Sequence, residues 1–357
     1  MKVVFALGRL DVGGVEMRTR ELLAELNARD IEMQFVVYSI SGLRGALDDD
    51  YRRLGAEIVY GRPGLIGLWH FWRTLRMLNA DVLHCNVSTA SGYYALVARL
   101  ACVPKVITHY RSMNDMRGGI FHGLKGRFGR WLSNRLSSNV IGVCSAVQDY
   151  AGPPATKWST VYDGILIQAG IRVHGPGLRV GYLGRLSPEK NPVRAIAIID
   201  AVRAHPTGGL ARLRMAGTGP PDVEAAVCKE IRMRGLEGAV ELLGNVVDPL
   251  GFLRSCDVLI LPSFREGLPG AVLEALSVGT PVVATDLPGV KEIAGLVTGI
   301  RFLSLSQSDQ AWADAVIDSL RLDAQVIIES FGRSPFLIER HADQMAELWG
   351  VKSRTAA

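Results

Sequence analysis

The sequence has no run of 18 consecutive apolar residues, although 48% of its 357 residues are hydrophobic. A helix that spans a membrane needs about 20 such residues, so none is expected. The five cysteines include no Cys-x-x-Cys pair, and the chain has no short-period repeat or low-complexity tract. These absences argue against a disulfide framework, a cysteine zinc site and a repeat protein, and they fit a reducing cytoplasm.

Two further signatures are missing. The first apolar run, residues 2–8, is followed by Arg9-Leu10-Asp11 rather than by a Gly-x-Gly-x-x-Gly segment, which disfavours an NAD dehydrogenase. The acidic run at residues 48–50 resembles a metal site only superficially, because it lies between glycine-bounded segments and is expected to be a solvated turn or helix start. We therefore predict no metal site and no cofactor.

What the sequence does contain is a repeated strand–loop–helix pattern. Short apolar runs predict strands, and stretches with helical spacing, such as residues 90–100, separate them. The predicted strands are residues 2–8, 33–38, 81–85, 105–109, 139–143, 180–184, 213–216, 240–243, 258–261 and 282–284. Alternating strands and helices of this kind predict parallel sheets covered by helices on both faces.

The chain is too long for one ordinary hydrophobic core. Glycine and proline crowd residues 164–178, where the pattern lapses, and this segment is interpreted as a linker between two domains. The predicted N-terminal domain is residues 1–170 and the C-terminal domain is residues 171–335. An amphipathic helix at residues 336–350 is expected to pack back on the N-terminal domain.

The most informative segment is residues 263–275, which follows the apolar run at 258–261 and opens a helix. Gly267 and Gly270 let a ligand approach the backbone, and the helix start suits an anion or sugar hydroxyls. Glu266 lies in the loop, and Glu274 follows eight positions later, about two helical turns on. Both carboxylates can accept hydrogen bonds from polyols. The spacing alone fits a capped helix with one exposed glutamate equally well.

This Glu–seven–Glu pattern, with Glu266-Gly267 at its head, is similar to the signature of retaining glycosyltransferase family 4, the glycogen-synthase-like group 1 glycosyltransferases. Residues 184–191 resemble the family's donor-phosphate segment, residues 217–220 its Gly-x-Gly-Pro turn, and residues 285–292 its following loop. The resemblance covers nearly the whole chain. It implies an α/β fold of the GT-B type, with two Rossmann-like doubly wound domains facing across a cleft.

The resemblance also implies roles for residues of the C-terminal domain. Glu266 would contact the hydroxyls of the donor sugar and Glu274 the nucleotide ribose. Arg185 and Lys190 would neutralise the diphosphate, and fixed cations there stabilise the negative charge that a leaving diphosphate gains in the transition state. The remaining donor-binding positions in this domain are Gly184, Gly267, Leu268 and Gly270. Two departures, Asp163 where relatives often have Asn and Pro269 in the glycine-rich loop, leave the identity of the donor open.

In the N-terminal domain the signals are weaker. Gly14 belongs to a glycine pair at a helix start and is expected to face the donor diphosphate or the acceptor. His109 ends a predicted strand at a position where the family commonly has a histidine near the donor sugar, although a lone histidine is more often structural. Arg111 follows it and is expected to shape the acceptor side.

The net charge of +5 is unevenly distributed, since residues 1–175 hold 21 Lys and Arg against 14 Asp and Glu. No acidic residue lies between Asp115 and Asp149. This stretch contains Arg117, Lys125, Arg127, Arg130 and Arg135, with Phe121, Leu124, Phe128, Trp131, Leu132 and Leu136 at helical spacing. A basic helix with aromatic anchors at about 118–136 predicts contact with anionic lipid, and the alternative is an ordinary helix whose apolar face is core.

The sequence thus predicts a retaining glycosyltransferase that moves a hexosyl or N-acetylhexosaminyl group from a nucleotide-diphosphate sugar, with UDP favoured, to a lipid-linked or polysaccharide glycan. The expected location is the cytoplasm or the inner face of the cell membrane. Two alternatives remain: a sugar-nucleotide epimerase of the same architecture and an inactive nucleotide-sugar-binding scaffold. Nucleic acid is not expected as a partner, because no recognition motif is present.

Overall fold

The structure is a computed structural model that describes all residues except 30, 32, 113–119, 169, 171–176 and 352–357. The chain divides into two compact units, unit 1 (Met1–Gly164 with Ile338–Ala357) and unit 2 (Ile165–Leu337). The first division precedes the predicted boundary at 170, and the second follows the predicted boundary at 335. Of the predicted linker, residues 169 and 171–176 lie outside the described residues.

Unit 1 contains a parallel sheet with the strand order β3-β2-β1-β4-β5-β6-β7. Its strands are β1 (Lys2–Leu7), β2 (Gln34–Ser39), β3 (Glu57–Tyr60), β4 (Val82–Cys85), β5 (Lys105–Tyr110), β6 (Asn139–Gly142) and β7 (Trp158–Thr160). The order reverses between β1 and β4, so the chain leaves these two neighbouring strands in opposite directions.

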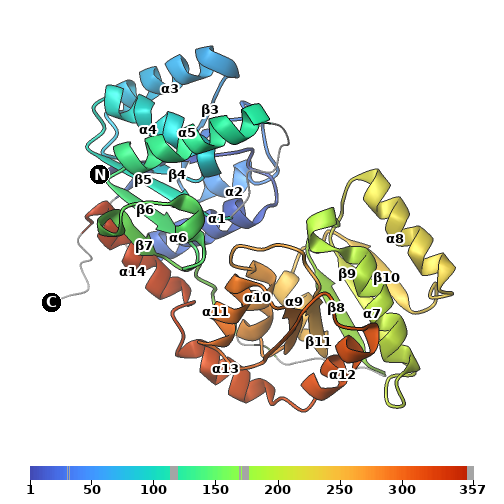
Figure 1. Cartoon of the computed structure of the whole chain (residues 1–357). Helices are drawn as coiled ribbons and strands as arrows, with labels where there is room; N and C mark the ends of the chain where they lie inside the picture. The colour runs from blue at the N-terminus through green and yellow to red at the C-terminus, as the bar shows by residue number, and fades with distance from the viewer. Residues whose placement is uncertain (30, 32, 113–119, 169, 171–176, 352–357) are drawn as a thin grey trace. The chain divides into compact units, whose positions relative to one another are not determined.

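Helices cover both faces of this sheet (Figure 1). They are α1 (Gly14–Ala28), α2 (Asp48–Arg53), α3 (Gly64–Leu78), α4 (Ser91–Leu100), α5 (Ile120–Leu136), α6 (Val147–Ala151) and α14 (Ile338–Trp349), with the 3-10 turns η1 (Ser88–Ala90) and η2 (Ala155–Lys157). One core cluster joins the sheet to α1, Tyr51 of α2, and α14. A second cluster joins the opposite face to α3 and α4, with Leu136 of α5 at its edge.

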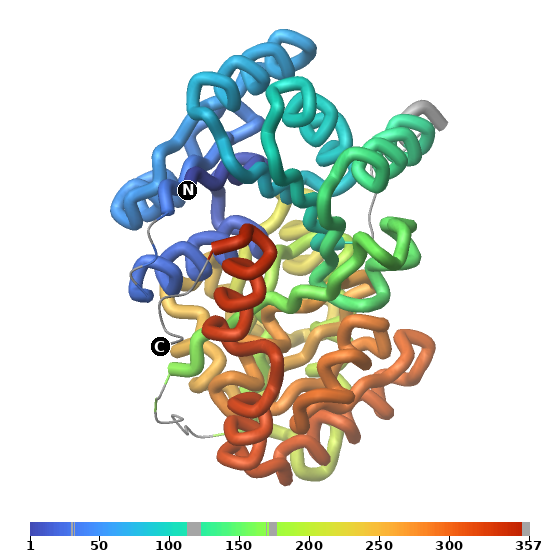
Figure 2. The backbone as a smooth tube through the Cα atoms, turned by 90° about the vertical axis from the view of Figure 1, so that its left-hand side faces the viewer, coloured from blue at the N-terminus to red at the C-terminus, as the bar shows by residue number. Residues whose placement is uncertain are grey.

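The predicted C-terminal helix is confirmed as α14, and it belongs to unit 1. In Figure 2 its red tube lies beside the blue tube of α1, against which it packs. Ala342, Met345 and Trp349 of α14 are buried in the same cluster as Phe5 of β1. The last helix of the chain therefore completes the core of the first unit.

Unit 2 contains a second parallel sheet, with the order β10-β9-β8-β11-β12-β13. Its strands are β8 (Arg179–Leu183), β9 (Arg212–Ala216), β10 (Val240–Gly244), β11 (Val258–Leu261), β12 (Val282–Thr285) and β13 (Ile300–Leu303). Here the order reverses between β8 and β11.

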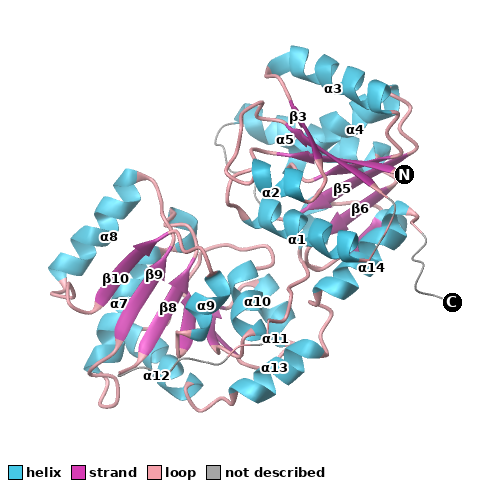
Figure 3. Cartoon of the chain, turned by 180° about the vertical axis from the view of Figure 1, so that it is seen from behind, coloured by secondary structure: helices cyan, strands magenta, loops and turns pink. Residues whose placement is uncertain are grey.

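Figure 3 shows helices on both sides of the magenta strands of unit 2. They are α7 (Pro192–Ala204), α8 (Pro221–Met233), α9 (Pro249–Arg254), α10 (Gly270–Ser277), α11 (Pro288–Ala294), α12 (Asp309–Ser319) and α13 (Ala324–Gly332), with the 3-10 turn η3 (Pro188–Lys190). The buried side chains of α7, α8 and α12, with Trp312 the largest, form one core cluster with the sheet. Both units are thus Rossmann-like, and the prediction of two doubly wound α/β domains is confirmed.

Glycines set the contact between α4 and α5 in unit 1. A Cβ atom on Gly92 would lie 1.9 Å from the carbonyl oxygen of Gly129, and one on Gly129 would lie 2.1 Å from that of Thr89. Both neighbours are backbone atoms and cannot rotate away. The inward side of α5 therefore carries Gly126 and Gly129 next to the buried Leu132, and this arrangement leaves the larger apolar residues of the helix on other sides.

We expect Gly129→Ala to destabilise unit 1 by about 1–3 kcal/mol, because overpacking displaces the backbone of η1. Gly123→Ala is the matched control on the same helix. Nothing lies within 4 Å of its Cβ position, so alanine should leave the stability unchanged or raise it by up to about 1 kcal/mol. Urea unfolding of both variants measures the difference, and equal stabilities would contradict the close approach of α4 and α5.

Candidate functional site

The carboxyl ends of β8 and β11 form the centre of the candidate site in unit 2. Ligands of doubly wound folds bind where the strand order reverses, because the loops that follow the two central strands diverge there. The loop after β8 carries residues 184–191 and the loop after β11 carries residues 262–269. These are the two segments in which the sequence predicted donor-binding residues.

An ion pair joins the two loops. Lys190 Nζ lies 2.6 Å from Glu266 Oε1 and 2.8 Å from Oε2, so the ammonium contacts both carboxylate oxygens. Ser263 Oγ donates a further hydrogen bond of 2.8 Å to Glu266 Oε1. The backbone N–H of Phe264 donates to the carbonyl oxygen of Glu189 at 2.8 Å. Because the Glu266 side chain is only 9% exposed, its charge is held by these partners and not by water.

Three loop contacts in unit 2 need glycine. A Cβ atom on Gly217, whose φ is +138°, would lie 2.0 Å from the carbonyl oxygen of Gly184, and one on Gly219 would lie 1.9 Å from that of Leu186. A Cβ atom on Gly289 would lie 1.8 Å from the carbonyl oxygen of Gly267. The loops after β9 and β12 therefore press directly against the two central loops and fix their backbone positions.

Gly270, the first residue of α10, differs from these glycines because nothing lies within 4 Å of its Cβ position. The protein itself does not require glycine there, and the space beside it is open to a ligand at a helix start. The side chain of Leu268 is buried. Arg185 is exposed, and Glu274 is half-buried within α10.

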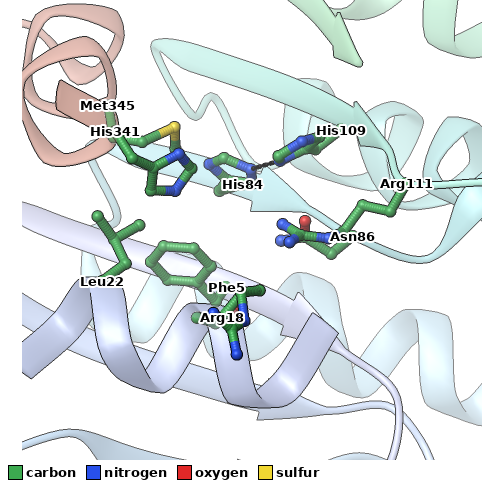
Figure 4. Close-up of a pocket in the computed structure, with 10 residues that line it drawn as sticks. Phe5, Arg18, Leu22, His84, Asn86, His109, Arg111, His341 and Met345 are labelled. Carbon is green, nitrogen blue, oxygen red and sulfur yellow. Dashed lines mark hydrogen bonds between the residues drawn. The ribbon is translucent and has the colours of Figure 1, made fainter. Parts of the chain in front are cut away.

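A second candidate site lies at the equivalent position of unit 1, beside the carboxyl ends of β1, β4 and β5. Figure 4 shows a small pocket there, with side chains from these strands, α1 and α14 around it. The lining residues are Phe5, Arg18, Thr19, Leu22, His84, Asn86, His109, Arg111, His341 and Met345. The predicted residue His109 is thus a pocket residue, as is Arg111.

His109 is 1% exposed and does not project into solvent. Its Nδ1 lies 3.2 Å from Nε2 of His84, and Trp349 Nε1 donates to Nδ1 of His84 at 3.3 Å. Arg111 forms an ion pair with Asp163, and the backbone carbonyl oxygen of Tyr162 lies 2.5 Å from His341 Nδ1. The departure at position 163 that the sequence analysis noted therefore supplies the carboxylate that holds Arg111.

The three histidines of this pocket are held neutral. Burial lowers the pKa of His84 to about 3 and that of His341 to about 4, from an ordinary value of 6.5. Burial also lowers the pKa of His109 well below that value. The positive charge of Arg111 disfavours a second positive charge on each ring and adds to all three effects.

Because these pKa values are lowered on folding, the unfolded chain binds more protons than the folded chain below about pH 6.5, and acid favours unfolding. The stability that unit 1 gains by keeping these histidines neutral is fully present above pH 6.5, and it is lost as the pH falls towards their lowered pKa values. At pH 5, His84 and His341 should each lower the free energy of unfolding of unit 1 by about 2 kcal/mol. We expect His84→Gln, which cannot titrate, to remove that share of the acid loss.

Urea unfolding at pH 7 and pH 5, followed by tryptophan fluorescence, measures this loss, since five of the six tryptophans lie in unit 1. An acid loss of equal size in the wild type and in His84→Gln would show that His84 is not a buried neutral histidine.

The other predicted residues of unit 1 lie away from this pocket or on its margin. Gly14 begins α1, and nothing lies within 4 Å of its Cβ position. On α5, Lys125, Arg127 and Trp131 are exposed, whereas Arg130 is half-buried, with its guanidinium 4.9 Å above the ring of Tyr150. Of the other residues predicted for this helix, Arg117 and the side chain of Phe121 lie outside the described residues.

The acidic run at residues 48–50 begins α2. Of the two predicted alternatives, a turn or a helix start, the structure shows the helix start. It is not fully solvated, because Asp48 is buried and accepts hydrogen bonds from Tyr60 and from the backbone N–H of Gly45. Asp50 forms an ion pair with Arg20. Within the described part of the chain, no group of three His, Cys, Asp or Glu side chains is arranged to hold a metal ion.

Several residues of this site were not predicted from the sequence. They are Arg18, His84, Asn86 and His341, which line the pocket, and Trp349, which is a partner of His84. His84 lies on the same face of the sheet as His109, because it pairs with Ile107 in the β4–β5 register and side chains alternate along a strand. This register is known only from the structure. Nothing in the sequence pattern connects Trp349 to this pocket, since 265 positions separate it from His84.

Comparisons with known proteins match both units. Residues 177–321 match the family model described as glycosyl transferases group 1, and residues 13–164 match the one described as glycosyl transferase 4-like domain. The capsular polysaccharide biosynthesis glycosyltransferase CapH of Staphylococcus aureus is 25% identical over 329 residues, which cover 88% of this chain and 90% of the relative. The putative glycosyltransferase EpsF of Bacillus subtilis is 25% identical over 342 residues, covering 88% and 86%.

Among solved structures, Anabaena HepE in complex with UDP-glucose superimposes with a TM-score of 0.79 at 21% identity, covering 97% of this chain and 98% of HepE. TarM superimposes with a TM-score of 0.77 at 12% identity, covering 98% of each chain. At these identities the likeness concerns the fold.

Proposed function

The chain belongs to the group 1 glycosyltransferases, and on that premise we propose that it transfers a hexosyl or N-acetylhexosaminyl group from a UDP-sugar, with retention of the anomeric configuration. The proposed acceptor is a growing polysaccharide or a lipid-linked glycan. CapH, a relative that matches over most of its length, is named for capsular polysaccharide biosynthesis. HepE, a structural neighbour, was solved with UDP-glucose.

The observation that carries the proposal is the Lys190–Glu266 pair at the strand-order reversal of unit 2. Glu266 has two carboxylate oxygens that can accept hydrogen bonds from sugar hydroxyls, and Lys190 has a positive charge for the donor phosphates. In the structure the two groups neutralise each other. When a donor binds, Lys190 and Glu266 therefore exchange each other for partners on the donor. Neither charged group is left buried without a partner, which would cost free energy.

We propose that the protein supplies the positive charge that the departing nucleotide diphosphate requires. Arg185 offers an exposed planar guanidinium, Lys190 a point charge, and the first turn of α10 its backbone N–H groups beside the open space at Gly270. These groups stabilise the transition state more than the ground state, because the bridging oxygen gains negative charge as the bond to the sugar breaks. A metal ion is then not required for this step.

Retention requires the acceptor to attack on the face from which the nucleotide leaves. In the proposed step the bond between the anomeric carbon and the phosphate oxygen breaks, and the acceptor oxygen bonds to the same carbon. The acceptor proton passes to the departing phosphate oxygen. His109, which is neutral, contributes as a hydrogen-bond group and not as a cation.

We expect UDP-sugars to raise the melting temperature more than GDP- or ADP-sugars, because a ligand that binds only the folded state stabilises it. Transfer to a lipid-linked acceptor should continue in EDTA. Proton NMR of the product should show the anomeric configuration of the donor. An inverted linkage contradicts the proposed mechanism, and stabilisation by another nucleotide alone contradicts the choice of UDP.

The control for this experiment is Lys190→Ala. Loss of one group that stabilises the transition state should lower kcat/KM by roughly 10²-fold or more, while circular dichroism stays unchanged. Turnover equal to that of the wild type would remove Lys190 from the site and would leave the family assignment intact.

We also propose that the acceptor is reached at an anionic membrane surface. The sequence left open whether the apolar residues of α5 are core. Leu132 is buried, but Leu124, Phe128 and Trp131 are exposed, and the rings of Phe128 and Trp131 stack at 5.6 Å between centroids. These side chains lie among Lys125 and Arg127, which are also exposed. This arrangement supports an interfacial helix.

The neighbouring helix α3, which was not predicted from the sequence to belong to this surface, also supports the proposal. Leu65 is 84% exposed and Met77 is 75% exposed, with Ile66 and Trp69 also outside the core. Helices α3, α4 and α5 contain no aspartate or glutamate. Their cationic residues are Arg73, Arg76, Arg99, Lys125, Arg127, Arg130 and Arg135. Exposed apolar side chains among cations, with no acidic residue, are the complement of an anionic bilayer surface.

We expect the protein to bind liposomes that contain phosphatidylglycerol, and not liposomes of phosphatidylcholine alone. Changing Lys125, Arg127 and Arg130 together to Glu should weaken binding by about 100-fold or more, since each cation near the surface contributes about 1 kcal/mol. The control changes Lys229, Arg232 and Arg301 of unit 2 to Glu, which alters the net charge equally. Equal binding by the two variants would show that α5 is not the contact surface.

Among the described residues, none of the helices has the length and apolar character of a membrane span. We expect high salt to release the protein from the proposed contact, because salt screens exposed charges.

A further inference from the structure

Three ring side chains form a hydrogen-bonded row in the core of unit 1. Trp349 of α14 donates its indole N–H to Nδ1 of His84 at 3.3 Å, and Nε2 of His84 lies 3.2 Å from Nδ1 of His109. All three side chains are at most 2% exposed. Figure 4 shows the dashed contact between the two histidines at the edge of the pocket.

The chemistry of the first group fixes the protonation of the other two. An indole nitrogen can only donate, so Nδ1 of His84 must accept and therefore carries no proton. A neutral His84 then has its proton on Nε2, from which it donates to Nδ1 of His109. The same reasoning leaves Nδ1 of His109 without a proton and places the proton of that ring on Nε2.

We propose that Trp349 and His84 are positioning residues that hold His109 in the Nε2–H tautomer, so that His109 presents one hydrogen-bond donor to an oxygen atom of the substrate in the pocket. The assignment of the tautomer stands on the geometry alone. The statement that the oxygen belongs to a nucleotide-sugar rests on the proposed function.

The far end of the row points to a ligand. Nε2 of His109 is buried and has no hydrogen-bond partner among the described residues, and the same is true of Oδ1 of Asn86, another pocket residue. A buried donor without a partner costs free energy, which a bound acceptor recovers. Phosphate and hydroxyl oxygens of a nucleotide-sugar are both suitable acceptors. Arg18 and Arg111 line the same pocket, and each is already in an ion pair, with Glu21 and Asp163 respectively.

Protonation of either histidine would oppose this arrangement. A second proton on His109 would place an N–H group opposite the N–H of His84, and a second proton on His84 would oppose the indole N–H. The titratable groups that face the row are Arg111 and His341, and a positive charge on either repels another on the rings. Burial and these charges lower the pKa of both histidines, which keeps the row neutral near pH 7.

Two substitutions of nearly equal shape test the row. In His84→Gln the amide carbonyl can accept from Trp349 while the amide N–H donates to His109, so the direction of the row is kept. In His84→Glu an ionised carboxylate accepts from both neighbours, and it should draw the His109 proton to Nδ1. If His84 were only a packing residue, both variants would leave His109 in the same state.

The measurement is nitrogen-15 NMR of protein labelled at histidine, with the His109 signals identified from His109→Gln. We expect the Nε2–H tautomer in the wild type and in His84→Gln, and protonated Nδ1 in His84→Glu at pH 8. Protonated Nδ1 in the wild type, or the same tautomer in both variants, would overturn the proposal. If His84→Glu does not fold, the test uses Trp349→Phe. This variant lacks the indole N–H that donates to Nδ1 of His84, so we expect His84 to show a mixture of tautomers or the reversed tautomer.

Separate experiments test whether His109 contacts the substrate. Addition of UDP alone and of UDP-glucose should distinguish phosphate from sugar oxygens through the shift of His109 Nε2. A shift with neither, although thermal shift proves binding, would place the substrate elsewhere and leave the tautomer assignment standing. In transfer assays kcat/KM of His84→Gln should exceed that of His84→Glu by about 10-fold or more, at equal melting temperature. Equal values would overturn the positioning role, and failure of all donors would contradict the proposed function instead.

Discussion

A parallel sheet gathers at one edge all the loops that follow its strands, and both candidate sites depend on this constraint. In unit 2 it brings together Lys190 and Glu266, which are 76 positions apart, across the reversal between β8 and β11. In unit 1 it brings β1, β4 and β5 to the rim of one pocket. Charge and hydrogen bonding then differ between the two edges: the first carries an ion pair, and the second carries neutral histidines beside arginines.

Sequence patterns predicted the central strands of both sheets to within one or two residues, because these strands are buried on both faces and appear as continuous apolar runs. The outer strands β3, β7 and β13 were missed. They are short and only partly buried, so polar residues interrupt the pattern. The residues predicted to bind the donor come from loops whose spacing is itself informative. The structure adds the reason for the glycines, which differs between Gly217 at a backbone contact and Gly270 beside open space.

The rest of the site depended on which faces meet in space. A helical pattern shows that α5 is amphipathic, but it does not show that glycines face inward and aromatic residues outward. The pattern also gave no reason to compare one side of the unit 1 sheet with the other. Helices α1, α2 and α14 carry Glu16, Glu21, Glu25, Asp48, Asp49, Asp50, Glu339, Asp343 and Glu347, while α3, α4 and α5 carry no acidic residue. The sheet thus separates two helical layers of different charge.

The position of α14 has a consequence for biosynthesis. The helix supplies Ala342, Met345 and Trp349 to the core of unit 1, yet all of unit 2 precedes it in the chain. On the ribosome, unit 2 can finish folding while unit 1 still exposes the groove on β1 and α1 that α14 fills. A nascent or prematurely ended chain would therefore hold an intact unit 2 and an incomplete unit 1. Chaperones and proteases would find their substrate at the amino-terminal half, although the missing residues belong to the carboxyl end.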